Sequence, residues 1–141
     1  ESQITGDTIH LFTKNKKADK VEAIENSLLV NKLDDQAFNQ IQATRMDGFF
    51  INGDIDSVRA KGFAQCIYYI QDDDSAYTGI NESRSETLDV YFKDKELQKV
   101  VFRRSVTGTI WPIKQKDPAA MRLPGFRWLD DRRPKTKYDL F

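Results

Sequence analysis

The feature that most constrains the fold of this chain is an ungapped internal repeat. Three valines, Val21, Val58 and Val100, anchor its units. An aromatic residue precedes each anchor by nine positions: Phe12, Phe49 and Tyr91. A turn-forming residue precedes each anchor by six positions: Asn15, Asn52 and Asp94. The shared register covers residues 9–30, 46–67 and 88–109. A period of this kind indicates repeated supersecondary units that stack to bury their apolar faces.

Each unit has the pattern of a β-hairpin. In the third unit Leu88, Val90 and Phe92 alternate with Asp89 and Tyr91, which is the period-two pattern of a strand. Polar segments follow at 15–17, 52–54 and 94–96, and the Asn-Gly pair in the second of them suits a tight turn with positive φ. We therefore predict an antiparallel all-β fold with hairpin turns at these three places and less than about a tenth of the chain in helix.

The remaining segments complete the predicted domain. The polar segments 31–43 and 71–86 are predicted to connect the hairpins, the second as an exposed loop. After Trp111 the four prolines of the chain punctuate an aromatic and basic tail. We predict that this tail, 111–141, closes the fold by lying over the last strand. The whole chain, 1–141, is then a single β-slab of stacked hairpins, which we expect to be a fragment of a longer protein.

The alternation also predicts which side chains point inward. They are Ile9, Leu11, Val21, Met46, Phe50, Val58, Leu88, Val90, Phe92, Val100 and Phe102, together with the small residues Ala23, Gly48 and Ala60. In most β-proteins such a stripe is ordinary core. If two facing sheets stay slightly apart, the same stripe forms an apolar slot that accommodates a lipid chain. The pattern leaves both interpretations open.

Composition and motifs argue against several classes of function. Lys plus Arg equals Asp plus Glu, 22 each, so there is no electrostatic case for nucleic acid. The only histidine, His10, falls on an outward position and has no partner ligands, and the only cysteine, Cys66, fits a small apolar filler better than a reactive thiol. No nucleophile elbow is present. We therefore predict no catalytic residues, no metal site, no cofactor and no enzymatic activity.

Two polar features each allow two interpretations. The run Asp72-Asp73-Asp74-Ser75 could bind calcium through its oxygens, but it lacks the glycine and the distant glutamate of an EF-hand loop, which favours a solvated acidic loop. The cations of the tail could remain solvated or could meet an anionic lipid headgroup or an acidic partner.

Two stretches carry a resemblance to a known family: residues 7–30, DTIHLFTKNKKADKVEAIENSLLV, and residues 125–141, GFRWLDDRRPKTKYDLF. Together with the repeated strand, Asn/Asp turn and second strand, they resemble the OstA-like (organic solvent tolerance) family, in particular its Bacteroidetes-type members. The resemblance covers essentially the whole chain. The Gly-Asn pair usual in that family is present only in part, as Asn26 and as Gly62.

The resemblance implies a function in lipopolysaccharide transport. The family fold is a twisted β-jellyroll, open at its ends, whose apolar interior takes the acyl chains of lipopolysaccharide and whose subunits stack end to end to bridge the inner and outer membranes. Because a stack of hairpins leaves strand edges unpaired at both ends, we also expect this chain to associate edge to edge. By this likeness the inward stripe would bind lipid, the protein would be periplasmic, and other envelope export components would be its partners. The competing hypothesis is a non-enzymatic cell-envelope scaffold with a filled core, which would use the tail as its docking site.

Overall fold

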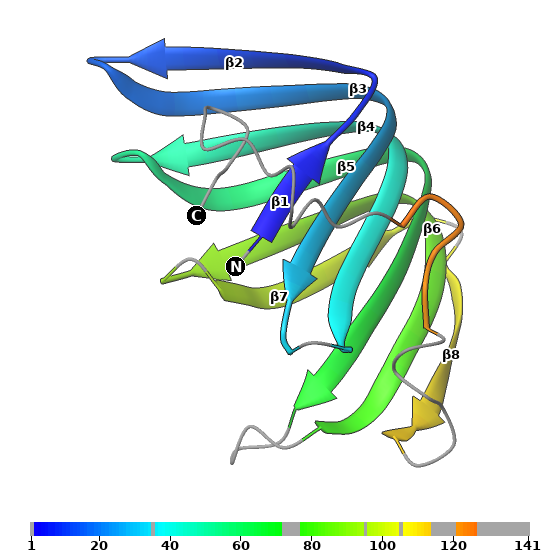
Figure 1. Ribbon diagram of the computed structural model, residues 1–141. Helices are drawn as coiled ribbons and strands as arrows, with labels where there is room; N and C mark the ends of the chain where they lie inside the picture. The colour runs from blue at the N-terminus through cyan, green and yellow to red at the C-terminus, as the bar shows by residue number, and fades with distance from the viewer. Residues whose placement is uncertain are drawn as a thin grey trace.

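The computed structural model describes residues 2–34, 36–71, 77–94, 96–104, 106–113 and 121–126. These residues form one open antiparallel sheet of eight strands, and none of them lies in an α-helix (Figure 1). The strands are β1 (Ser2–Thr5), β2 (Thr8–Lys14), β3 (Lys17–Lys32), β4 (Phe38–Ile51), β5 (Asp54–Gln71), β6 (Tyr77–Lys93), β7 (Glu96–Arg103) and β8 (Thr107–Pro112). The predicted all-β slab is confirmed. Within the described ranges there is no helix that is long and apolar enough to cross a membrane.

The three hairpin turns lie where the repeat predicts them. Lys14 pairs with Lys17, Ile51 with Asp54, and Lys93 with Glu96. The first turn has positive φ at Asn15 and Lys16, the second at Asn52 and Gly53, and the third at Asp94. Asparagine, aspartate and glycine tolerate this left-handed conformation better than other residues, so the turn chemistry of the sequence accounts for the positions of the hairpins.

A bend across the middle of the sheet divides it into two half-sheets (Figure 1). The first half-sheet contains the described residues of 8–24, 45–61 and 87–103, and the second contains those of 2–5, 27–43, 64–85 and 107–112. At the bend the register shifts between Ile24 and Ser27 in β3 and between Lys61 and Ala64 in β5. Irregular pairing of this kind twists a strand and redirects it.

Left-handed residues mark this bend at equivalent positions of the repeats. They are Glu25 and Asn26 in β3, Gly62 and Phe63 in β5, and Arg104 after β7. The Asn26 side chain donates to the Asp7 carboxylate at 2.9 Å, and the Thr44 hydroxyl donates to the Gly62 carbonyl at 3.2 Å. The partial Gly-Asn motif of the sequence therefore stands at the bend.

The edges of the sheet follow the same plan. Strands β1 and β2 both pair with β3, one on each side of the bend, and β7 and β8 both pair with β6. Each edge is in effect one bent strand that is interrupted at the bend. The architecture is thus three bent hairpins laid side by side.

The predicted connectors are mostly strand. Residues 38–43 belong to β4 and 77–86 to β6, so the prediction of connectors over 31–43 and 71–86 is wrong for these parts. Their strand pattern is obscured because buried polar residues occupy positions that a sequence pattern assigns to the surface. Asn31, Asn39 and Gln40 are each 5% exposed or less. The Asn31 amide donates to the Ser2 hydroxyl at 2.7 Å, which satisfies its polar group inside the sheet.

Strand pairing defines two faces. The inner face carries the largest apolar cluster, which runs through both half-sheets, and the outer face is the opposite one. In the second half-sheet the row of Leu29, Ile41 and Cys66 is on the inner face, whereas the next row, Val30, Gln40 and Ile67, is on the outer face.

Residues 121–126 cover part of this outer face. Gln40, which is fully buried, donates to the carbonyl of Met121 at 2.7 Å and accepts from the amide of Leu123 at 2.8 Å. Gln42 accepts from the amide of Gly125 at 3.0 Å. Residues 121–126 therefore lie on β4, in the middle of the sheet, and Trp111 and Pro112 end β8 itself, so the prediction that the tail lies over the last strand is wrong for these parts; residues 114–120 and 127–141 lie outside the described residues.

Replacing Gln40 with leucine should detach this segment at small cost in volume. The amide of Leu123 would lose the hydrogen bond to Gln40, and the carbonyl of Met121 would keep only the one from Arg122, so we expect the free energy of unfolding to fall by about 2 kcal/mol. Urea denaturation measures the loss. The exposed Gln98→Leu is the matched control, for which we expect a change within about 0.5 kcal/mol. Equal effects of the two substitutions would contradict the role assigned to Gln40.

Candidate lipid-binding interior

The predicted inward residues form continuous rows across the first half-sheet. One row is Leu11, Val21, Gly48, Val58, Val90 and Val100, and the next is Ile9, Ala23, Met46, Ala60, Leu88 and Phe102. Phe50 and Phe92 lie closer to the turns, where they pair with Ile55 and Leu97. Because residues paired across strands share a face, each repeat contributes the same positions to a single surface.

All eleven predicted site residues belong to one apolar cluster. Seven are buried: Val21, Met46, Phe50, Val58, Leu88, Val90 and Phe92. The other four, Ile9, Leu11, Val100 and Phe102, are partly buried and pack against it. The last four stand on β2 and β7, the edge strands of the first half-sheet, so the interior is least covered at its two edges. Whether these residues bind lipid stays a prediction.

The apolar surface continues past the bend. Ile4, Leu29, Ile41 and Cys66 of the second half-sheet are each 3% exposed or less and join the same cluster. These residues form one row, which ends in Ser83 on β6 and Gly108 on β8. The interior is therefore one apolar surface that extends over both half-sheets and ends in a serine and a glycine on one side.

A pocket of about 540 Å³ lies on the outer face of the second half-sheet, between residues 122–124 and strands β5, β6 and β8. Ser83 and Gly108 line it together with Cys66, Arg84 and Leu123, among other residues of β5, β6, β8 and the 121–126 segment. None of its lining residues is among the eleven predicted site residues. Sequence reasoning missed this pocket because it depends on the second half-sheet and on the position of residues 122–124.

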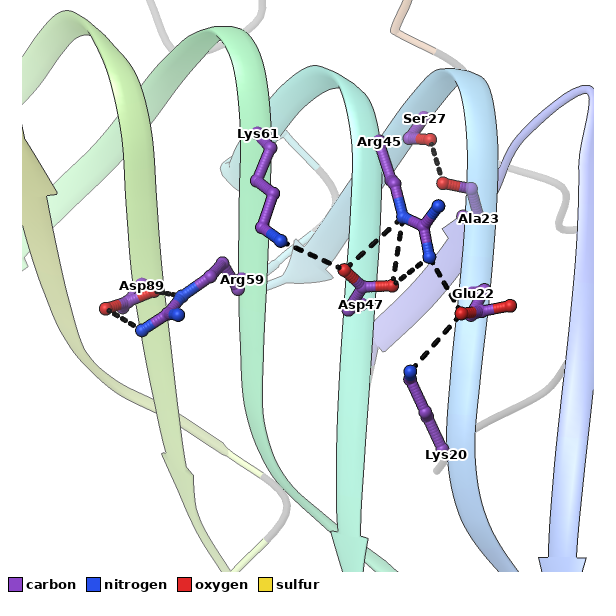
Figure 2. A network of polar contacts seen from close by, with 9 residues as sticks. All are labelled: Lys20, Glu22, Ala23, Ser27, Arg45, Asp47, Arg59, Lys61 and Asp89. Atoms are coloured by element: carbon purple, nitrogen blue, oxygen red, sulfur yellow. Dashed lines mark hydrogen bonds and ion pairs between the residues drawn. The ribbon is translucent and has the colours of Figure 1, made fainter.

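Ion pairs cover the opposite, outer face of the first half-sheet (Figure 2). Arg45 bridges Glu22 at 2.7 Å and Asp47 at 3.1 Å, and Lys61 lies 3.8 Å from Asp47. Hydrogen bonds to Glu22, foremost from Lys20, hold the pKa of this carboxyl group below its usual value. These side chains come from three successive strands, so the network links β3, β4 and β5 on the face opposite the apolar rows.

A second group of charges centres on Asp89. Its carboxylate accepts from Nε of Arg59 and from Nε of Arg103, both at 2.8 Å. Asp89 is only 3% exposed. The hydrogen bond from Arg59 and then that from Arg103 hold the pKa of Asp89 below its usual value, against the opposing effect of desolvation. This carboxylate stabilises β5, β6 and β7 in register.

The lowered pKa of Asp89 makes its contribution depend on pH in a defined direction. Because the folded pKa lies below the unfolded one, the stabilisation is complete above the unfolded pKa, about 3.9, and is lost as pH falls through the folded pKa. We expect Asp89→Asn to lower the free energy of unfolding by about 2 kcal/mol at pH 7. The difference from wild type should shrink as the pH drops below 4. Urea denaturation at pH 7 and pH 3 measures both; a constant difference would contradict this account.

The structure also places His10 and Cys66, the two residues that the sequence analysis weighed as possible ligands or nucleophiles. His10 is exposed on the outer face, with Nδ1 3.6 Å from Glu22. Cys66 is buried in the apolar cluster, where desolvation raises the pKa of its thiol, as the filler interpretation requires. The acidic run at 72–75 lies outside the described residues. Among the described residues there is no group of three or more His, Cys, Asp or Glu side chains that could hold a metal ion.

No protein-family model matches the chain, and no curated protein matches it significantly.

Proposed function

We propose that this protein binds lipopolysaccharide through its apolar interior and takes part in carrying it across the periplasm to the outer membrane. The observation that carries the proposal is the apolar inner face, which is continuous through a bent, open sheet and includes all eleven residues predicted from the repeat. An acyl chain requires an extended apolar surface, which the aligned rows provide. The resemblance to the OstA-like family supports the choice of ligand.

The partly buried residues suggest where a lipid would enter. Val100 and Phe102 on β7, with Ile9 and Leu11 on β2, lie at the two edges of the first half-sheet. An acyl chain inserted there would displace few interior contacts. The same edges present backbone groups that could pair with a second copy or with another envelope export component, which is the edge-to-edge association expected from the sequence.

A filled-core scaffold is the second candidate, and a specific observation favours it. Met46, Ala60, Leu88 and Val90 are 0% exposed, so the centre of the interior is packed by the protein itself. In a scaffold the rows would only stabilise the sheet, and partners would bind elsewhere. The two candidates differ in whether lipid enters the interior.

Native mass spectrometry of protein purified from a host that makes lipopolysaccharide separates these candidates. We expect a bound species with the mass of lipopolysaccharide or lipid A. The edge variant Phe102→Ser should lose it, and Val101→Ser, its neighbour on the outer face, should keep it. Protein that never carries lipid, or lipid that both variants retain equally, would favour the scaffold and overturn the proposal.

A further inference from the structure

A second surface of the first half-sheet has features that its role in folding does not require. On the outer face, six residues form one straight row across six strands: Phe12, Lys20, Phe49, Ser57, Tyr91 and Lys99. This outer row contains the aromatic residue of every repeat. It lies one row closer to the hairpin turns than the ion pairs that involve Glu22, Asp47 and Asp89.

The three aromatic rings are open to solvent. Phe12 is 46% exposed, Phe49 is 43% exposed and Tyr91 is 37% exposed. A single exposed aromatic residue is ordinary, but a row of them at equivalent positions is a surface patch of the kind that marks a binding site. Replacing these rings with polar residues would remove few core contacts, because the apolar cluster lies on the other face of the sheet.

The three rings are regularly spaced along a line that crosses the strands. One strand separates Phe12 from Phe49, and one strand separates Phe49 from Tyr91. Neighbouring strands lie roughly 4.8 Å apart, so successive rings are roughly 10 Å apart along a line perpendicular to the strands. The row thus offers an extended ligand one stacking position about every two sugar rings of a linear glycan.

Positive charge accompanies the rings. Nζ of Lys20 lies 5.8 Å from the centre of the Phe49 ring and 3.2 Å from Glu22. The outer row and the two rows beside it toward the bend carry Lys20, Arg45, Arg59, Lys61, Lys99 and Arg103, but only Glu22, Asp47 and Asp89 as carboxylates. Over these three rows cations outnumber carboxylates by six to three, and the exposed Asp19 and Asp56, at the bulges beside the outer row, bring the carboxylates to five. The remaining excess of positive charge favours an anionic ligand over a cationic one.

We propose that the outer row binds a linear acidic polysaccharide laid across the strands. The apolar faces of alternate sugars would stack on Phe12, Phe49 and Tyr91, and the acidic groups would meet Lys20 and the arginines beside the row. Stacked bases of a single nucleic-acid strand follow each other at roughly 3.4 Å, a poorer match to the ring spacing. A membrane surface would favour apolar side chains that protrude from a loop, whereas these rings lie half-covered on the strands of a sheet.

Binding of oligogalacturonate, a linear probe with one carboxylate on each sugar, tests the proposal by titration calorimetry. We expect wild-type protein to bind it, more weakly at high salt, and not to bind neutral cello-oligosaccharide. Each of Phe12→Ala, Phe49→Ala and Tyr91→Ala should lower the affinity about fivefold, and the triple variant should lose binding. Phe49→Trp should keep or improve it. Phe63→Ala and Ile110→Ala, at exposed apolar residues outside the row, are the controls and should bind normally.

Three results would overturn the assignment. They are wild-type protein that does not bind the probe, a triple variant that binds as well as wild type, and tighter row-dependent binding to single-stranded DNA or to vesicles of anionic phospholipid. The proposal does not depend on the lipid function, because the outer row and the apolar rows are on opposite faces of the sheet.

Discussion

Replacing Phe92 with aspartate should lower the free energy of unfolding by about 4 kcal/mol and should abolish lipopolysaccharide binding. Phe92 is 7% exposed and belongs to the inner apolar cluster. The substitution removes a large apolar side chain and places a carboxylate within an apolar cluster, and each change is costly by itself. Because domains of this size have only about 5–15 kcal/mol of stability, we expect a weakened but folded protein.

Phe63→Asp is the matched control, since Phe63 is 89% exposed at the bend and belongs neither to the apolar cluster nor to the outer row. Its free energy of unfolding should change little, because the new carboxylate remains in water. Urea denaturation and lipopolysaccharide binding are measured on both variants. A stable Phe92→Asp protein that binds lipid normally would contradict the assignment of the inner face, and a fully unfolded one would favour the filled-core scaffold.

Gly48→Val should be the next most damaging substitution, with an expected loss of about 3 kcal/mol in the free energy of unfolding. Gly48 is in the inner row between Val21 and Val58. A Cβ atom at this position would lie 2.6 Å from Cγ1 of Val21, closer than two such atoms can approach. Glycine is required here because the side chain of Val21 fills the space that a side chain at position 48 would need, although glycine is a poor strand residue by itself.

A double substitution separates this overpacking from a simple preference for glycine. In Val21→Ala/Gly48→Val the methyl groups move from one strand to the next, and the side chain that the new valine would meet is removed. We expect the double variant to be more stable than Gly48→Val alone, which thermal melting can measure. Losses that add without compensation would show that the contact with Val21 is not the cause.

The repeat in the sequence contained enough information to locate the three turns and the inner rows. Asn15, Asn52-Gly53 and Asp94 specify turns locally, and the period-two alternation around Val21, Val58 and Val100 specifies a face. Both signals are local in the sequence, so they can be recognised without knowledge of the tertiary fold.

The second half-sheet could not be predicted in the same way. The chain enters this half-sheet after residues such as Glu25 and Arg104. Both are in the left-handed conformation, which the conformational preferences of glutamate and arginine do not predict. Beyond the bend, buried polar residues such as Gln40 interrupt the alternation, and their hydrogen-bond partners are as distant in sequence as Met121 and Leu123. The bend and the outer cover formed by residues 121–126 therefore depend on long-range contacts.

Photo-crosslinking at two adjacent positions of β7 tests the central claim most directly. Val100 is on the inner face and Val101, paired with Asp89, is on the outer face. A benzophenone amino acid is introduced at either position, the protein is irradiated with lipopolysaccharide, and adducts are detected by mass. We predict a lipid adduct from position 100 and none from position 101. Equal adducts from both positions, or none from position 100, would contradict a lipid-binding interior.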